Sequence, residues 1–135
     1  MAKRVAEHPL TGYVRQLAAF MGLGQFHVTV KTGETETEDA FAENVVWEER
    51  YRGDITISQN WKSPSRDELR EVLVHELLHL HFADLDHAFY ATKPLIGRPA
   101  YEVAVARYRG DREKTVQQIA RFWAPHLPLP PKVAE

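Results

Sequence analysis

Apolar residues recur along the chain at intervals that predict first a helix, then strands, then helices again. Leu10, Val14, Leu17 and Met21 are spaced by three or four residues, which is the repeat of an amphipathic helix. Thr11 is the expected N-cap of this helix, because its hydroxyl can accept a hydrogen bond from a free backbone N–H. The glycines that follow are expected to end the helix.

Three later stretches are predicted to be β-strands. Residues 26–31 alternate between apolar and polar side chains, and residues 44–51 and 55–58 are rich in β-branched and aromatic residues. Arg52-Gly53-Asp54 has the composition of a tight turn, so the second and third strands are predicted to form a β-hairpin. The predicted sheet is therefore small, with about three strands.

The longest helical pattern follows these strands. Ser65 and Glu68 have the spacing of a capping box, and they predict a helix that runs to about Ala83. Residues 84–87 are expected to end or bend this helix. Its predicted buried stripe consists of Leu69, Leu73, Leu77 and Leu80.

The C-terminal part is predicted to be helical up to a proline-rich tail. Pro99 suits the first turn of a helix, and Gly110-Asp111 is expected to kink or break that helix. Residues 116–123 are predicted to form a last amphipathic helix, which Pro125 stops. Residues 128–131, with three prolines in four positions, cannot be helical and are expected to be extended.

Composition places these elements in one globular domain over residues 1–135, with a tail at 125–135. Hydrophobic residues make up 44% and the net charge is −2, so nothing in the charge argues for nucleic acid or a membrane surface. The chain has no cysteine, which excludes disulfides and thiolate metal ligands. Residues 1–9 lack the apolar core of a signal peptide, and no apolar run reaches the roughly 20 residues of a membrane span. We therefore expect a cytoplasmic protein of the α+β class.

The predicted long helix carries the pattern His-Glu-x-x-His at residues 75–79. His75 and His79 lie one turn apart on the same helix face, so both imidazoles can reach one metal ion. Glu76 lies about 100° around the helix from His75, where it can accept a proton from a water bound to that metal. Two histidines and a glutamate on an otherwise apolar helix would be costly to bury without a partner, which favours a zinc site.

A catalytic zinc site usually has three protein ligands, so a third residue is needed. Metzincins have Gly three and His six residues after the second histidine, whereas this chain has Phe82 and Leu85, which excludes that class. Glu102 is the preferred candidate, because it follows His79 by 23 residues and has small or apolar neighbours that suit a packed second helix. The alternatives, for which a surface position is the preferred interpretation, are Asp84, Asp86, His87 and His126.

Residues 75–79 together with Glu102 resemble the gluzincin metallopeptidases, which use two histidines and a glutamate from a later helix. Over residues 26–110, the order of strand, hairpin and helices is similar to that of the minimal single-domain gluzincins. The resemblance implies a zincin-like fold with a mixed sheet whose edge strand aligns an extended substrate, and residues 55–59 are the expected edge. Many gluzincins also have Asp four residues after the metal-binding Glu, as a partner of the first histidine. This chain has Ala106 there, which leaves the orientation of the first histidine unexplained.

The predicted function is that of a zinc-dependent metallopeptidase that acts on a peptide or protein. Zn²⁺ would be held by His75, His79 and Glu102, and Glu76 would pass the proton of the attacking water to the leaving amine. The alternative is a zincin-fold metal-binding domain with a regulatory or interaction role and little or no turnover. The residues considered for stabilising the oxyanion are Tyr101, Tyr108, Arg107, Arg109 and His126.

The tail, residues 127–135, is predicted to be an extended segment rich in proline. A zincin cleft accepts extended peptides, and proline resists cleavage. We therefore also consider that the tail inhibits its own chain or a neighbour by occupying the cleft, as C-terminal segments do in some minimal gluzincins. The competing interpretation is a disordered terminus.

Overall fold

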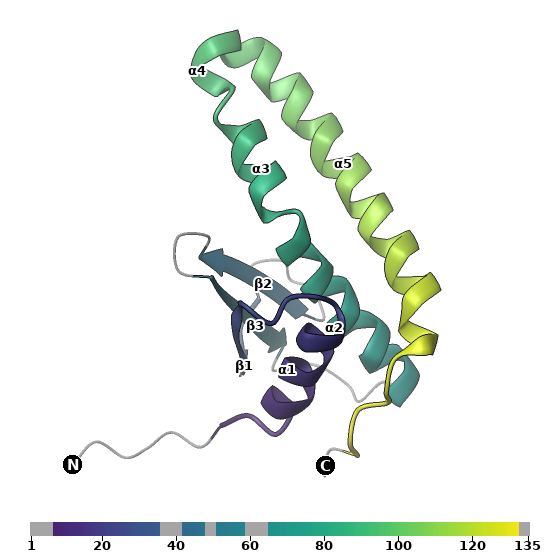
Figure 1. The fold of residues 1–135 in the computed structure, drawn as a ribbon. Helices are drawn as coiled ribbons and strands as arrows, with labels where there is room; N and C mark the ends of the chain where they lie inside the picture. Colours follow the sequence, from purple (N-terminus) through teal and green to yellow (C-terminus); the bar gives the residue numbers. More distant parts are fainter. Residues whose placement is uncertain (1–6, 36–41, 48–50, 59–64, 133–135) are drawn as a thin grey trace, which may run out of the picture.

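The structure is a computed structural model that describes residues 7–35, 42–47, 51–58 and 65–132, without the side chains of 43–47 (Figure 1). Its elements are α1 (Thr11–Phe20), β1 (His27–Gly33), β2 (Ala42–Trp47), β3 (Arg52–Ser58), α2 (Arg66–His81), α3 (Ala83–Tyr90), α4 (Lys93–Ile96), α5 (Arg98–Trp123) and the 3₁₀ turn η2 (Ala124–His126). Helices and strands lie in separate segments of the chain, which confirms the predicted α+β class. Within the described ranges, no helix combines the length and the apolar character that crossing a bilayer requires.

The strands pair in the order β1-β3-β2. β2 runs antiparallel to β3, so the predicted β-hairpin is confirmed. β1 pairs in parallel with the other side of β3, where Val30 lies opposite Ile55. β3 is therefore the central strand, and the prediction of a sheet edge at residues 55–59 is wrong for 55–58, while residue 59 lies outside the described residues. A parallel partner comes from a separate stretch of the chain, so a local pattern does not reveal it.

The segment Arg52-Gly53-Asp54 belongs to β3, which corrects the turn predicted there. Tyr51, just before it, has a φ of 46°, a left-handed conformation that is typical of turns. Gly53 is accounted for by packing, because a Cβ atom at this position would lie 2.9 Å from Cδ2 of Leu80. The glycine lets α2 approach the central strand closely.

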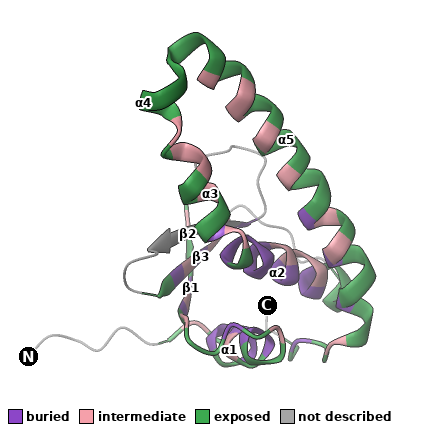
Figure 2. Cartoon of the chain, turned by 45° about the horizontal axis from the view of Figure 1, so that its top comes forward, coloured by how far each residue is buried: buried purple, intermediate pink, exposed green. Residues whose placement is uncertain are grey.

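The core forms where α1 packs against β1 and α2 packs against β2 (Figure 2). Alternate residues of β1 and β3 are buried in it, as expected for strands with one covered face. The buried apolar side chains from the strands are Val28, Val30, Ala42, Ile55 and Ile57. The predicted stripe of α2 is confirmed, because all four of its leucines are buried.

Helix α2, which carries both histidines, begins where the sequence predicts. The Oγ atom of Ser65 accepts a hydrogen bond from the backbone N–H of Glu68 at 3.2 Å, which confirms Ser65 as the N-cap. The helical chain bends at Phe82, between α2 and α3. Residues 84–87, where the bend was expected, lie inside α3.

Two other predicted helix features are wrong. Helix α1 begins at Thr11 with Leu10 at its N-cap, and the buried Thr11 hydroxyl has no hydrogen-bond partner among the described residues. Gly110 does not break the C-terminal helix, which runs without interruption from residue 98 to 123. An interior glycine costs only about 1 kcal/mol, and the ion pair between Arg107 and Asp111 at 2.8 Å spans it.

The helices α3 and α4 and the N-terminal half of α5 form an arm that extends away from the sheet (Figures 1 and 2). Most residues of this arm are exposed. The buried residues of α5 are Val116 and Ala120, both in its C-terminal half. That half is therefore the part of α5 that is packed into the core.

The described part of the tail, residues 127–132, lies against α1 and the N-terminal half of α2. Three side chains donate hydrogen bonds to its carbonyls: Arg70 Nη1 to Leu127, Tyr13 Oη to Pro128 and Arg66 Nε to Pro130, at 2.8, 2.7 and 2.8 Å. None of these three hydrogen bonds involves His75 or His79. The tail was expected either to occupy the cleft or to be a disordered terminus, but residues 127–132 are docked outside the histidine site. Residues 133–135 lie outside the described part of the chain.

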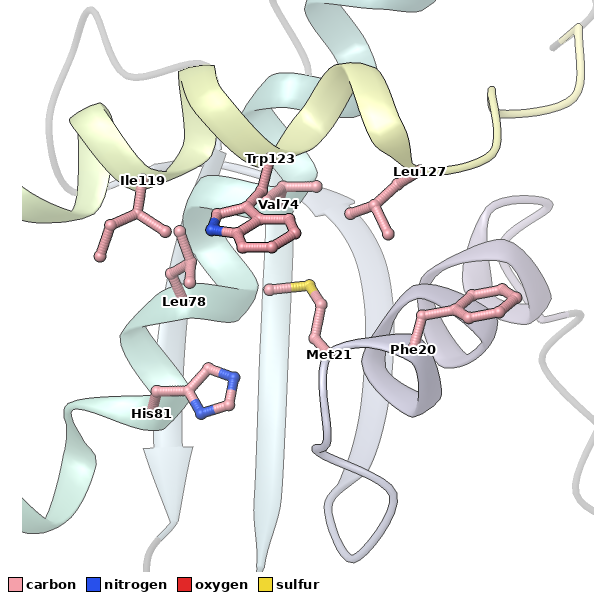
Figure 3. Close-up of a pocket in the computed structure, with 8 residues that line it drawn as sticks. All are labelled: Phe20, Met21, Val74, Leu78, His81, Ile119, Trp123 and Leu127. Carbon is pink, nitrogen blue, oxygen red and sulfur yellow. The ribbon is translucent and has the colours of Figure 1, made fainter.

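The tail also borders an apolar groove of about 300 Å³ between α1, α2 and α5 (Figure 3). Trp123 and Val74 lie beside each other along this groove, and Met21 lies opposite Trp123. Leu127 also packs against the core, and this apolar contact adds to the three hydrogen bonds that hold the tail.

Candidate metal centre

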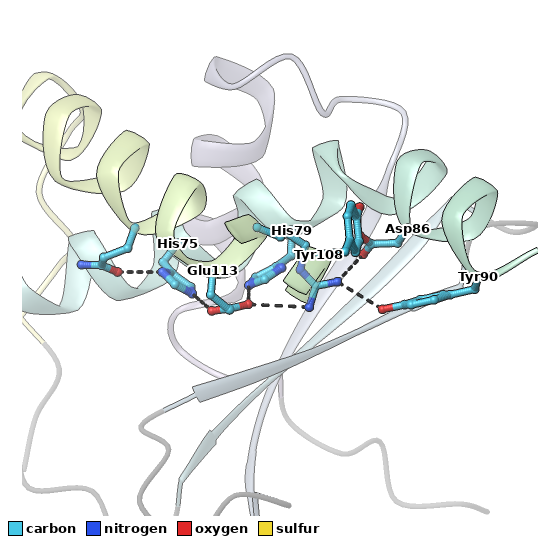
Figure 4. A network of polar contacts seen from close by, with 8 residues as sticks. His75, His79, Asp86, Tyr90, Tyr108 and Glu113 are labelled. Atoms are coloured by element: carbon cyan, nitrogen blue, oxygen red, sulfur yellow. Dashed lines mark hydrogen bonds and ion pairs between the residues drawn. The ribbon is translucent and has the colours of Figure 1, made fainter. Parts of the chain in front are cut away.

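His75 and His79 project from the same face of α2 toward α5 (Figure 4). Their ring centroids are 5.2 Å apart, as the one-turn spacing predicts. Nε2 of His79 lies 3.0 Å from Oε1 of Glu113, and Nε2 of His75 lies 3.4 Å from Oε2 of the same carboxylate. The three residues each offer one donor atom within 4.8 Å of the others, which is close enough to hold one metal ion.

Glu113 reaches the histidines because of how α5 packs. Val116 and Ala120 are fully buried against the core and lie three and seven residues after Glu113. Residues at these intervals share one helix face, so the packing of this apolar stripe directs Glu113 toward α2. Glu113 itself stays half exposed, which leaves one side of the cluster open to solvent.

Gln117 fixes the orientation of His75. Its Oε1 atom lies 2.8 Å from Nδ1 of His75, and its Nε2 donates a hydrogen bond to Glu71 at 3.3 Å. Because the amide nitrogen is used as the donor to Glu71, the amide oxygen accepts from Nδ1–H of His75. The proton of the neutral ring is thereby placed on Nδ1, and the lone pair of Nε2 is directed toward Glu113.

The structure does not bring Glu102 to the two histidines. Its carboxylate pairs with Arg98 at 2.9 Å and is 61% exposed. It lies eleven residues before Glu113 on α5, which is about 16 Å along the helix axis. The apolar neighbours of Glu102 indicated a packed helix, but Val103 beside it is 74% exposed. The spacing of Glu113 to Val116 and Ala120 is the signal in the sequence that would have identified it.

The four alternative ligands also lie outside the three-residue group found in the described ranges. Asp86 forms an ion pair with Arg112 at 2.9 Å, and the exposed Asp84 and His87 are on α3. His126 lies about 6 Å from the rings of its neighbours Phe122 and Trp123.

Burial sets the electrostatic state of the second histidine. It lowers the pKa of the His79 imidazole below its ordinary value, although the carboxylate of Glu113 acts in the opposite direction. The positive charge of Arg112 lowers this pKa further. His79 therefore favours the neutral form at neutral pH, and only the neutral imidazole can bind a metal.

Glu76, the predicted general base, follows His75 on α2 and is buried, with 8% of its surface exposed. Its position in the helix is about 100° from that of His75. This offset keeps Glu76 out of the histidine face, and its role as a base stays a prediction.

A second polar cluster adjoins the three candidate ligands (Figure 4). Nη1 of Arg112 lies 2.9 Å from Asp86 and donates to the hydroxyl of Tyr90 at 3.3 Å. Tyr108 donates to the other oxygen of Asp86 at 2.5 Å. Burial, with help from this hydrogen bond, raises the pKa of Tyr108 to about 12, so its hydroxyl stays protonated. Reasoning from the sequence did not identify Arg112.

The five residues considered for the oxyanion role have other contacts. Tyr108 forms a hydrogen bond with Asp86, and Arg107 forms an ion pair with Asp111. Arg109 lies over the ring of Tyr90, and the rings of Tyr101 and His126 lie beside those of Phe89 and Trp123.

Searches against models of protein families, curated proteins and solved structures found no match to this chain.

Proposed function

We propose that this chain is a zinc-dependent metallopeptidase with His75, His79 and Glu113 as ligands and Glu76 as the general base. The convergence of two imidazole nitrogens and one carboxylate on a single point carries the proposal. The histidines come from an i, i+4 pair on α2, and the carboxylate comes from a later helix, as in the gluzincins that the sequence resembles. A zincin-like arrangement, with this helix beside a mixed sheet, forms part of the proposal.

The donor set fits zinc. Catalytic zinc sites in proteins commonly have two histidines and one glutamate and keep a fourth position open. His75 is oriented with Nε2 toward the cluster, and burial favours the neutral form of His79, which can bind a metal. The half-exposed carboxylate of Glu113 leaves the cluster open to a substrate.

In the proposed hydrolysis, the metal site, Glu76 and Gln117 have different roles. A zinc ion held by this site would polarise the peptide carbonyl and acidify a water molecule. Glu76 accepts one proton from the attacking water as the new C–O bond forms. The same proton passes to the leaving nitrogen as the C–N bond breaks, so the products are a carboxylic acid and an amine. Gln117 holds His75 in its ligating orientation throughout.

Elemental analysis of protein purified without a histidine tag tests the metal site. We expect about one zinc per chain, and loss of that zinc in His75→Ala and His79→Ala. Full occupancy in both variants would refute the ligand assignment.

Turnover is tested separately, with labelled casein and a mixed peptide library as substrates. Glu76→Gln should keep zinc and fold but lose at least about 100-fold in rate, because an amide cannot act as a base at neutral pH. A wild-type protein that holds zinc and cleaves neither substrate would favour the metal-binding domain without turnover.

A further inference from the structure

Arg112 lies beside the candidate metal centre but is not one of its three candidate ligands. Its side chain is only 15% exposed, and its partner Asp86 is 17% exposed. By contrast, the ion pair of Arg107 and Asp111, one turn away on the same helix, is 82% and 59% exposed. Exposed pairs of that kind contribute little, whereas burying a guanidinium is costly and needs partners such as Asp86 to compensate it.

The contacts of Arg112 fix its guanidinium group, with Nη1 toward Asp86 and Nη2 toward Glu113. Nη1 contacts Asp86 and Tyr90, and the centre of the group lies 5.8 Å from the centroid of the Tyr108 ring. Tyr108 is itself held in place, because its ring stacks on Phe89 at 4.5 Å. Nη2 has Glu113 Oε1 at 3.7 Å, which is beyond hydrogen-bond distance. Nη2 therefore faces the candidate ligands and forms a long ion pair with Glu113, without a hydrogen bond.

The charges around Arg112 suit an anion that forms during a reaction. Asp86 balances the resting charge of Arg112, and Glu113 is shared between the two histidines. A donor that is already oriented stabilises developing negative charge without reorganising, and this is often the largest contribution to catalysis. Among the described Arg, Lys and Tyr side chains, Arg112 is the one that forms an ion pair with a candidate ligand, Glu113.

We propose that Arg112 is a catalytic residue whose Nη2 binds the carbonyl oxygen of the scissile peptide and stabilises the oxyanion. This inference rests on the proposed peptidase function. Negative charge builds on the carbonyl oxygen as the water oxygen adds to the carbonyl carbon, and it leaves when the C–N bond breaks. Asp86, Tyr90 and Tyr108 are positioning residues, which hold the guanidinium group so that Nη2 faces the reacting carbonyl.

Two peptide probes test the role without measuring turnover. A peptide phosphonate carries a tetrahedral anion like the proposed intermediate, and a peptide hydroxamate of the same sequence carries a planar group. We expect Arg112→Met to bind the phosphonate about 100-fold more weakly than the wild type, and to lose much less affinity for the hydroxamate. Calorimetry on zinc-loaded protein would give both dissociation constants, and the zinc content of each sample would be measured in parallel.

The choice of variants keeps loss of folding apart from loss of the donor. Arg112→Lys keeps the charge beside Asp86 but replaces the planar fork with a single ammonium group, so it should fold and still lose phosphonate affinity. Arg107→Met removes an exposed arginine from the same helix and should bind both probes like the wild type. Thermal unfolding would establish that the variants are folded.

Each outcome decides the inference. Equal phosphonate affinity in wild type, Arg112→Met and Arg112→Lys would overturn it and leave Arg112 as a brace between α3 and α5. A wild type that holds zinc but binds neither probe would overturn both the inference and the peptidase function, while the metal site would stand. A wild type that binds no zinc would overturn the proposed function itself.

Discussion

Nδ1 of His75 lies 2.8 Å from Oε1 of Gln117, while Nε2 of the same ring faces Glu113. Gln117 follows Glu113 by four residues, which is the spacing at which gluzincins have an aspartate as the partner of the first histidine. With Glu102 as the proposed ligand, Ala106 stood at this position and left His75 without a partner. With Glu113 as the proposed ligand, Gln117 takes the position. An amide in place of a carboxylate orients the ring but adds no negative charge, so it makes His75 a less basic ligand than an aspartate would.

Replacing Gln117 with Leu should weaken zinc binding by about 10- to 100-fold, the usual effect of losing a hydrogen-bond partner behind a ligating histidine. Gln117→Glu should retain or strengthen binding, because a carboxylate can accept the same proton. Competition with a chromogenic chelator would give the dissociation constants. Gln118→Leu, at the exposed neighbouring position, is the matched control, and an equal loss in both leucine variants would contradict the role of Gln117.

Glu113→Gln should lose more zinc affinity than the Gln117 variant, because it removes the charged ligand itself. Glu102→Gln should bind zinc like the wild type, since Glu102 pairs with Arg98 on the exposed arm. Metal per chain, measured after dialysis against the same chelator, compares the two variants directly. The opposite order of affinities would restore Glu102 as the ligand.

Stability at high pH should depend on Tyr13. Burial raises the pKa of Tyr13 to about 12, while nearby Arg70 and Arg66 act weakly in the other direction. A tyrosine in the unfolded chain ionises near pH 10, so the contribution of Tyr13 to stability is complete below pH 10 and is lost as the pH rises toward 12. At pH 9 the wild type should exceed Tyr13→Phe by about 1 kcal/mol in unfolding free energy, the usual value of one hydrogen bond.

Urea unfolding at pH 9 and at pH 11.5 would test this dependence. The difference between wild type and Tyr13→Phe should shrink at the higher pH, because Tyr13 ionises in the unfolded chain but stays largely protonated, and bonded to Pro128, in the folded protein. The exposed Tyr51 provides the control, and Tyr51→Phe should show no such change. A constant difference across this range would show that the pKa of Tyr13 is the same in the folded and the unfolded protein.

Deleting residues 127–135 should destabilise the protein by roughly 3 kcal/mol, because three hydrogen bonds to tail carbonyls and the contacts of Leu127 are lost. Zinc affinity should fall as well, since the tail follows directly on the helix that carries Glu113 and Gln117. Chemical unfolding and chelator competition would measure the two effects. Deleting only 131–135 keeps every carbonyl in these hydrogen bonds and should leave both quantities near their wild-type values. Higher peptidase activity with unchanged stability after the longer deletion would instead support inhibition by the tail.

The parts of the fold that depend on neighbouring residues could be predicted from the sequence. The cap at Ser65, the leucine stripe of α2 and the side-by-side placement of His75 and His79 all follow from intervals within one helix. The pairing of β1 with β3 depends on chain segments more than twenty residues apart, and no local pattern encodes it.

The third member of the site illustrates the same limit. Finding Glu113 requires knowing that α5 continues through Gly110 and that Val116 and Ala120 are its packed face. The break that the sequence predicts at Gly110 hides this continuous helix, so the packed face that directs Glu113 toward α2 is not recognised. Arg112 depends on still more distant information, because its partner Asp86 lies on another helix.

The hydrogen bond from Tyr13 to Pro128 joins positions 115 residues apart, and it has a consequence for how the chain is made. Synthesis proceeds from the N-terminus, so α1, the sheet and α2 emerge from the ribosome before α5. In a growing chain, the proposed metal site would therefore lack Glu113 for some time and consist of His75 and His79 alone. Contacts of such long range also form slowly. Capture of the metal should accordingly be among the last events of folding, after α5 has docked on α2.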